Sequence, residues 1–339
     1  MLVACSLFND QPPGSVTTTL DRAAESIREV EGVKVVQVNV HAVGRQSDHA
    51  KPEAWMADLV ITVEPTLADL NHVASAVERE IATANSTLSM MGTLYLPADS
   101  AGPAAGIEFA ASRNLPGAKR VTAADLTTAT QSLRTIDGVR DLLVSSDGRP
   151  ATMSVESPGE WPRVAAALRA LPGFGDGALA YATVETTYRI GMTLNPVSPT
   201  PALVDVLSSL ASGPSVEGFS FSDVPPGEPQ HVHGWRPQVS VHVSADAAAE
   251  AAVDRGTRAE RGATPVETAE AEGTRVAEVL MQLDDAATQV DGIPRASFLV
   301  LAIAGGEPIY HDGFLGLPLG SAEPDDFVAP LSSGDEPPR

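Results

Sequence analysis

Three histidines in the second half of the chain could ligate a metal ion. His231 and His233 are separated by one valine, and His242 follows in the next β-rich stretch. Side chains two residues apart in a strand lie on the same face, so the first two imidazoles could bind one ion. With a carboxylate from Asp223 or Glu228 they would form a ligand set that Zn²⁺ accepts. A metal-binding module is therefore one of three functional hypotheses.

The segment that carries two of these histidines favours a loop. Residues 224–237 are rich in Pro and Gly and separate two β-rich stretches. Histidines in loops are usually solvated, and Trp235 would then cover a sheet edge. We therefore expect no bound metal and no other cofactor. The metal content of the purified protein, compared with that of His231→Ala, tests this expectation.

Other catalytic patterns are incomplete. The run from Gly173 to Gly177 resembles part of a dinucleotide-binding loop, but it follows a predicted helix and precedes a predicted strand. A true dinucleotide loop has the opposite order. The chain has neither a lysine after a suitable glycine run nor a G-x-S-x-G elbow. We expect no enzyme and no catalytic residue.

The only cysteine of the chain is Cys5, and Leu2, Val3 and Ala4 precede it. This string resembles the lipobox of bacterial lipoproteins. The polar segment that follows, residues 6–15, contains Pro and Gly and is typical of a flexible tether. The resemblance implies that Cys5 becomes the N-terminus and carries a thioether-linked diacylglycerol. It also implies an extracytoplasmic protein that is anchored to the cell membrane through Cys5.

The segment before the cysteine is shorter than a signal peptide. Export needs a basic segment and about 7–15 apolar residues before the cleavage site, and only Met1 to Ala4 precede Cys5. We expect the remainder in frame upstream of Met1, or removed by trimming. A stop codon directly upstream would favour the second hypothesis, a cytosolic acidic interaction module that starts at Met1 and keeps a free thiol.

The composition limits the classes of partner. With 43% apolar residues the chain is typical of a globular protein, and its net charge is −22. An acidic surface repels phosphate backbones and anionic lipid heads, so nucleic acid is not an expected partner. Attachment to a membrane would depend on acyl chains. The chain contains only three lysines and many alanines, which is typical of high-GC actinobacteria.

A helix-to-strand junction with a glycine occurs three times, at Gly32, Gly138 and Gly292. Each follows an amphipathic stretch, and glycine suits the left-handed residue that ends a helix. The predicted helices are 17–30, 67–84, 122–136, 160–171, 201–211 and 266–289. The predicted strands are 33–43, 59–63, 87–96, 107–111, 139–144, 179–185, 187–194, 216–221 and 239–243, with a closing pair within 298–314.

The central elements follow the order β-α-β-β-α-β, with an Asp-Gly hairpin at Asp147-Gly148. That order is typical of the split βαβ arrangement. We therefore predict an α+β fold of two or three tandem ferredoxin-like units, whose antiparallel sheets are covered by helices on one face. The predicted regions are a lipobox and tether at 1–16, α/β units at 17–100, 101–186 and 187–320, an insertion at 246–265 and a disordered acidic tail at 321–339.

The first functional hypothesis is a membrane-anchored envelope lipoprotein with a non-enzymatic binding or scaffold role. Its partner would be an unknown envelope protein or a small ligand. The cytosolic module and the metal-binding module are the alternatives.

Overall fold

The computed structural model describes residues 11–43, 54–64, 69–82, 88–110, 121–224, 236–244, 265–304 and 307–324. The chain divides into unit 1, Met1–Met153 with Asp176–Ala180, and unit 2, Ser154–Gly175 with Tyr181–Arg339. The division of the sequence into three α/β units stays a prediction. Most of the predicted insertion and residues 325–339 of the predicted tail lie outside the described ranges.

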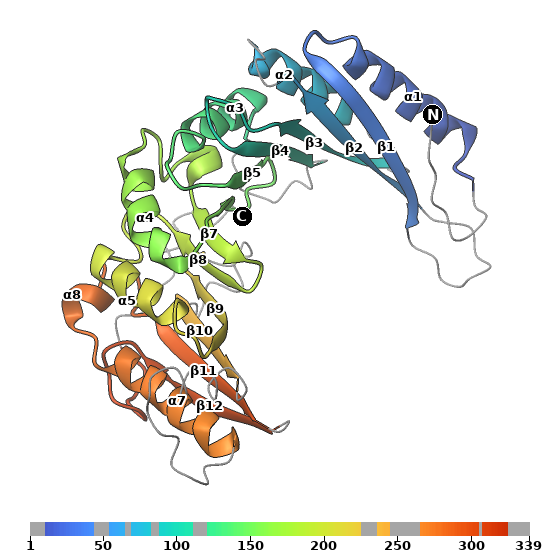
Figure 1. The fold of residues 1–339 in the computed structure, drawn as a ribbon. Coiled ribbons are helices and arrows are strands. Elements are labelled where there is room, and N and C mark those ends of the chain that lie inside the picture. The colour runs from blue at the N-terminus through green and yellow to red at the C-terminus, as the bar shows by residue number, and fades with distance from the viewer. Residues whose placement is uncertain are drawn as a thin grey trace, which may run out of the picture. The chain divides into compact units, whose positions relative to one another are not determined.

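Helices and strands alternate regularly in both units (Figure 1). The elements of unit 1 are α1 (Gly14–Arg28), β1 (Val33–Val43), β2 (Ala54–Val63), α2 (Leu70–Ile81), β3 (Leu88–Leu96), β4 (Ala104–Ala110), α3 (Ala123–Leu133), β5 (Asp141–Ser145) and the short helix η2 (Gly177–Leu179). Strand β6 (Ala151–Ser154) follows β5. The elements of unit 2 are η1 (Pro158–Glu160), α4 (Trp161–Ala170), β7 (Ala182–Thr187), β8 (Ile190–Leu194), α5 (Pro201–Ala211), β9 (Val216–Ser222), β10 (Gln238–Ser244), α7 (Pro265–Met281), α8 (Asp285–Thr288), β11 (Ser297–Ala304) and β12 (Glu307–Phe314).

The strands form one mixed sheet whose spatial order is the order of the chain, from β1 to β12. Hairpin partners are antiparallel, as in β1–β2, β3–β4, β7–β8, β9–β10 and β11–β12. Strands on either side of a helix are parallel neighbours, as in β2–β3, β4–β5, β8–β9 and β10–β11. The repeating unit is therefore a helix followed by a β-hairpin.

The predicted fold class, tandem ferredoxin-like units with antiparallel sheets, is wrong. In a split βαβ arrangement another strand lies between the two parallel strands that a helix connects. Here β2 and β3, which α2 connects, are hydrogen-bonded directly to each other. The same holds for β4 and β5 around α3. Each hairpin therefore lies next to the hairpin that precedes it in the chain.

The order of elements along the chain is the same in both arrangements, which explains the error. What distinguishes them is whether a crossover skips one strand position. That choice depends on pairing between residues far apart in the sequence, and local periodicity carries no information about it.

The predicted elements themselves are largely confirmed. Two of them, Val33–Val43 and Pro201–Ala211, have the predicted bounds. Thr122 caps α3, and its hydroxyl accepts a hydrogen bond from the Asp125 amide in a capping box, an arrangement that contributes about 1 kcal/mol. The single helix predicted over 266–289 is wrong, because Asp284 accepts a hydrogen bond from the Ala287 amide and starts the separate helix α8.

The three junction glycines adopt the left-handed conformation that the sequence predicts. Their φ angles are 87° at Gly32, 80° at Gly138 and 76° at Gly292. A Cβ at Gly292 would meet no atom within 4 Å, so backbone conformation alone accounts for glycine at this position.

The helices of unit 1 cover one face of its strands (Figure 1). Leu20 and Ile27 of α1 and Val77 of α2 are buried against Ile61 of β2 and Leu94 of β3. Fully burying one such side chain contributes about 1.5–3 kcal/mol. No helix among the described residues covers the other face of this sheet.

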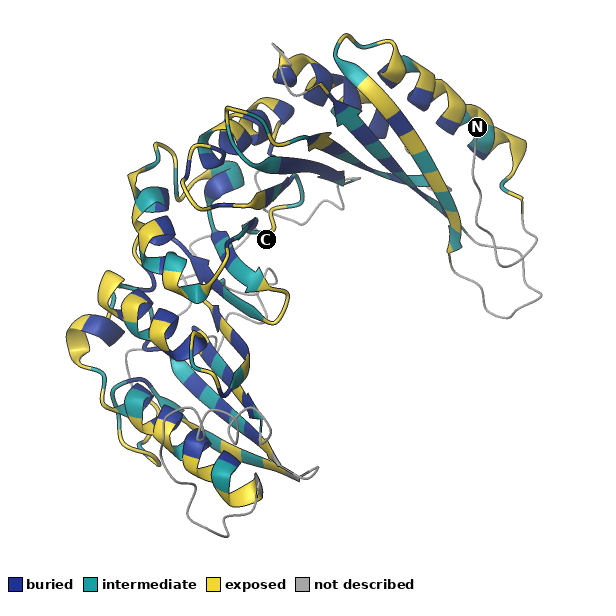
Figure 2. Ribbon diagram, viewed as in Figure 1, coloured by how far each residue is buried: buried dark blue, intermediate teal, exposed yellow. Residues whose placement is uncertain are grey.

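Unit 2 has the same layered arrangement, with α4, α5, α7 and α8 on one face of the strands (Figure 1). Trp161 of α4 and Phe219 of β9 pack with ring centroids 5.6 Å apart and planes tilted by 49°. Along strands of both units, buried residues alternate with more exposed ones (Figure 2). The sequence therefore places one row of residues in the strands under the helices and the other row on the face that no described helix covers, which we call the open face.

Candidate functional site

The open face of unit 1 is defined by the alternation along β2. Ala57, Leu59 and Ile61 are buried under the helices, whereas Met56 and Asp58 are half-buried on the opposite side. Because directly paired residues of neighbouring strands share a face, the register of the ladders extends this assignment to the other strands.

Large exposed apolar side chains lie on the open face of each unit. In the described part of the chain, nine large apolar residues are exposed, and five of them lie on open-face rows of the strands. These five are Val35, Val43, Tyr95, Ile303 and Tyr310. No helix in the described part of the chain covers the strand face on which they lie, and exposed apolar patches commonly mark interaction sites.

Tyr95 lies in a row that crosses unit 1. Its cross-strand partners are Thr62 of β2 and Gly106 of β4, and Gly106 pairs in turn with Leu143 of β5. The Tyr95 side chain is 49% exposed. A Cβ at Gly106 would lie 2.8 Å from Leu143 Cδ1, so Leu143 occupies the space above the glycine. The row presents an aromatic and an aliphatic side chain on either side of a glycine.

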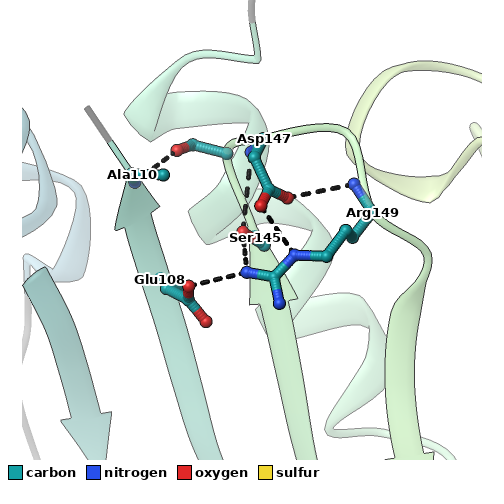
Figure 3. Close-up of polar contacts among 6 residues, drawn as sticks. Glu108, Ala110, Ser145, Asp147 and Arg149 are labelled. Atoms are coloured by element: carbon teal, nitrogen blue, oxygen red, sulfur yellow. Dashed lines mark hydrogen bonds and ion pairs between the residues drawn. The ribbon is translucent and has the colours of Figure 1, made fainter. Parts of the chain in front are cut away.

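A charged cluster lies next to this row (Figure 3). Arg149 Nη2 donates to Glu108 Oε1 at 2.6 Å, and its Nε donates to Asp147 Oδ2 at 2.6 Å. The same Nη2 lies 3.3 Å from the hydroxyl oxygen of Ser145. Glu108 is buried although it lies on the open face, because Arg149 covers it. The cluster joins β4 to the hairpin after β5.

The electrostatics of this cluster point to a structural clamp. Burial by itself lowers the pKa of Arg149, but the carboxylates of Glu108 and Asp147 outweigh it and raise that pKa. An arginine that is neutralised by two carboxylates offers little attraction to an anionic ligand. Partly exposed ion pairs of this kind contribute up to about 1 kcal/mol to stability. The cluster therefore shapes the open face and is a poor candidate for a catalytic centre.

The open face of unit 2 is apolar at one end. Leu301 of β11 pairs with Tyr310 of β12 and with His242 of β10 in one row. Ile303 continues the apolar strip beside Ser244. Toward β7, small hydroxyl side chains replace the apolar ones, and the hydroxyls of Thr183 and Thr193 lie 3.1 Å apart.

Unit 2 also contains a buried acidic side chain, that of Asp223. Asp223, at the end of β9, is 2% exposed and accepts a hydrogen bond from Asn195 Nδ2 at 2.7 Å. Burial raises the pKa of Asp223 to about 6, although hydrogen bonds from Ser198 and Asn195 act in the opposite direction. Burial and the charge of Asp223 also raise the pKa of Tyr181.

The network around Asp223 fixes a loop. Asn195 Oδ1 accepts hydrogen bonds from the amides of Val197 at 2.9 Å and Ser198 at 2.6 Å. The Asn195 amide donates to Ser198 O at 2.8 Å. Asp223 therefore fixes the side chain of Asn195, which in turn binds the backbone of the connection between β8 and α5.

The residues singled out from the sequence are only partly placed. Cys5, His231 and His233 lie outside the described residues, as do Glu228 and Trp235. His242 lies on the open face of β10, and its partner in β9 is Gly218. Within the described ranges, no group of three or more His, Cys, Asp or Glu side chains could hold a metal ion.

Sequence reasoning missed the open-face residues. The signal was present, since Tyr95 alternates with the apolar Leu94 and Leu96, and Glu108 interrupts an apolar run. Such alternation separates two faces of a strand, but it does not show which face the helices cover. The partners of Arg149 could not be found without the strand register.

The fold and the open face define a class: an α/β repeat protein in which, over the described residues, the helices cover one face of the strands and leave the other uncovered. No family model, curated protein or solved structure matches this chain. None of the helices described here combines the length and apolar character needed to cross a bilayer.

Proposed function

We propose that this chain is a non-enzymatic binding scaffold that is tethered to a membrane surface through Cys5 and docks a protein partner on the open face. The observation that carries the binding role is the exposed apolar side chains of that face. Tyr95 and Tyr310 are 49% and 57% exposed, and the neighbours of Tyr95 on the opposite side of its strand, Leu94 and Leu96, are buried. Tyrosine is enriched at protein interfaces because one side chain offers apolar area and a hydroxyl.

The repeat architecture supports a scaffold role. In repeat proteins each unit packs on its neighbours, and the resulting extended surface is commonly the binding surface. Within each unit the exposed apolar residues lie on two strands, β1 and β3 in unit 1 and β11 and β12 in unit 2. This distribution favours the flat surface of a protein over a small ligand. The clamp at Glu108 and Arg149 keeps the centre of the unit 1 surface polar and ordered.

The tether rests on the lipobox-like string that ends at Cys5 and on the Pro/Gly-containing segment after it. One acyl chain binds a bilayer only marginally, so the diacylglycerol that such a cysteine carries in lipoproteins is required for stable attachment. The net charge of −22 disfavours electrostatic attachment to anionic lipids.

Replacing Cys5 should release the protein from the membrane. In the native host we expect the wild type and Ser6→Ala to sediment with membranes and to incorporate an alkyne-tagged fatty acid. Cys5→Ala should remain in the supernatant and incorporate none. Equal sedimentation of all three proteins would contradict the tether. So would mass spectrometry that shows Met1 retained and the thiol free, which is the result that the cytosolic alternative predicts.

The open face can be tested by photocrosslinking. We expect a benzoylphenylalanine at Tyr95 or Tyr310 to give a discrete adduct in cells, and one at Arg22, an exposed residue of α1, to give none. Thr62→Arg, beside Tyr95, should reduce the Tyr95 adduct several-fold, and Thr18→Arg on α1 should leave it unchanged. Adducts of equal yield from Arg22, or insensitivity to Thr62→Arg, would contradict the proposal.

A further inference from the structure

We propose that two copies of this chain associate through β1, whose outer edge pairs antiparallel with β1 of the second copy around Asn39. The two sheets would then continue into one another across a two-fold axis. This interface shares Val35 and Val43 with the open face, but the proposal depends neither on a protein partner nor on the lipid tether.

Among the residues that the structure describes, β1 has a hydrogen-bonded neighbour on one side only. It stands at the end of the strand order and pairs with β2 over most of its eleven residues. Alternate peptide groups of a strand point to either side, so half of those in β1 face its outer edge. Unpaired edges template pairing with another chain unless the sequence protects them.

The open-face row of β1 is self-complementary about Asn39. Val35 and Val43 stand at equal distances on either side, and so do Gln37 and His41. In the proposed register each Val35 lies opposite Val43 of the second copy. Both valines are exposed, at 44% and 38%, so dimer formation would cover apolar surface that the single chain leaves in water.

The helix-facing row has the same symmetry. Val38 lies opposite Val40, and Val36 lies opposite Ala42. A two-fold axis perpendicular to the sheet keeps the helices of both copies on the same face, so rows of equal character meet. β1 contains no acidic residue, and therefore two chains of strongly negative charge meet here without facing carboxylates in the paired strands.

β12, at the other end of the strand order, is better protected against edge pairing than β1. β12 contains Pro308, which lacks an N–H donor, and the exposed Asp312. Proline and charge are the usual means by which proteins block edge pairing. β1 has Lys34 at one end and no proline. The contrast favours a closed dimer through β1 over open head-to-tail chains.

Self-association can be measured directly on the whole 339-residue chain without acyl chains. Light scattering over a concentration series should give twice the chain mass of 35.1 kDa. The pair of changes Val35→Lys and Val43→Lys places like charges opposite each other twice, and should weaken the dimer at least about tenfold. Val35→Lys with Val43→Glu places opposite charges there and should restore association. Ile303→Lys, on β11, is the matched control and should leave the dimer intact.

The register can be tested with single cysteines in a Cys5→Ser background. Asn39→Cys should form an intermolecular disulfide under mild oxidation, since directly opposed strand residues have Cβ atoms about 4.5–5.5 Å apart. Gln37→Cys alone should not, because the two copies of residue 37 would be about 13 Å apart along the strands. Gln37→Cys combined with His41→Cys should crosslink again.

The mass of a single chain at all concentrations would overturn the proposal. Protection of the outer-edge β1 amides from hydrogen exchange in a monomer would also overturn it, because another segment of the same chain would then occupy the edge. A dimer in which the charge pairs have no effect and Asn39→Cys does not crosslink would overturn the β1 interface, since another surface would then hold the copies together.

Discussion

Arg134→Ala is expected to lower the free energy of unfolding of unit 1 by about 3–5 kcal/mol. Arg134 lies at the end of α3, and its side chain is 8% exposed. It donates to Asp99 Oδ1 at 2.7 Å and to the carbonyl oxygens of Pro97, Gly102 and Pro103 at 3.2, 3.2 and 2.9 Å. Removing the guanidinium takes a donor from a largely buried carboxylate and from three carbonyl oxygens. Asp99 Oδ1 would keep the Ala101 amide as a donor, and Gly102 O would keep the Asp99 amide.

The geometry of this contact favours arginine over lysine at position 134. A lysine carries the charge but lacks the planar set of donors that reaches four oxygens at once. We expect Arg134→Lys to recover less than half of the loss. Gly102 belongs to the same contact, because its φ is +152° and a Cβ there would lie 2.3 Å from Arg134 O. Gly102→Ala should therefore be strongly destabilising as well.

Hydrogen exchange of the amides in α3 and β4, followed in the full chain, measures the effect within unit 1. Arg22→Ala, at an exposed position of α1, is the control and should change stability by about 0.5 kcal/mol or less. If Arg134→Ala accelerates exchange no more than Arg22→Ala does, the assignment of Arg134 as the main polar support of this turn is wrong.

Asp223→Asn is expected to stabilise unit 2 at pH 7, by up to about 3 kcal/mol at 1.36 kcal/mol per pKa unit. The folded-state pKa of about 6 lies above the ordinary value of 3.8. At pH 7 the wild type therefore holds a buried carboxylate whose charge is poorly solvated. An asparagine has nearly the same shape, and its amide oxygen can still accept the hydrogen bond from Asn195.

The pH dependence has a defined sign. Because the folded-state pKa of Asp223 is raised, folding takes up a proton between the two values. Below about pH 4 the Asp223 side chain is neutral and does not lower the free energy of unfolding. As the pH rises through 6 the buried side chain becomes charged, and the free energy of unfolding decreases. The stability of the wild type should fall over this window, and that of Asp223→Asn should fall less. At pH 4 the two proteins should differ little.

Denaturant unfolding at pH 4 and pH 7 tests this prediction. Asp205→Asn, at an exposed position of α5, removes the same charge without burial and serves as the control. A wild-type stability that rises with pH by the same amount as that of Asp223→Asn would contradict the prediction, as would equal stabilities at pH 7.

The helices and strands of this chain follow from its local sequence. The run Val33–Val43 is β-branched throughout much of its length, and the start of α3 combines Thr122 with Asp125 in a capping box. These features act through residues within one turn or one strand of each other, so they can be seen without tertiary information. The start of β2 at Ala54 was missed because Asp58, a polar residue on the open face, interrupts the apolar pattern.

The candidate site depends on contacts between residues that are far apart in the sequence. The alternation around Tyr95 predicts two faces of a strand, but only the position of α2 and α3 shows which face stays open. Glu108 and Arg149 are far apart in the sequence, and their contact requires β4 and β5 to be parallel neighbours. The same is true of Asn195 and Asp223, which β8 and β9 bring together.

By itself the sequence determined where most helices and strands lie, which glycines turn the chain and the one cysteine at which a lipid could be attached. These properties depend on side chains that are neighbours along the chain, and their energies are decided locally. Only the tertiary structure decided that each helix connects adjacent parallel strands, which face of the sheet remains uncovered, and which buried charges meet. These depend on pairing free energies between distant segments, which can be nearly equal for two arrangements of the same elements.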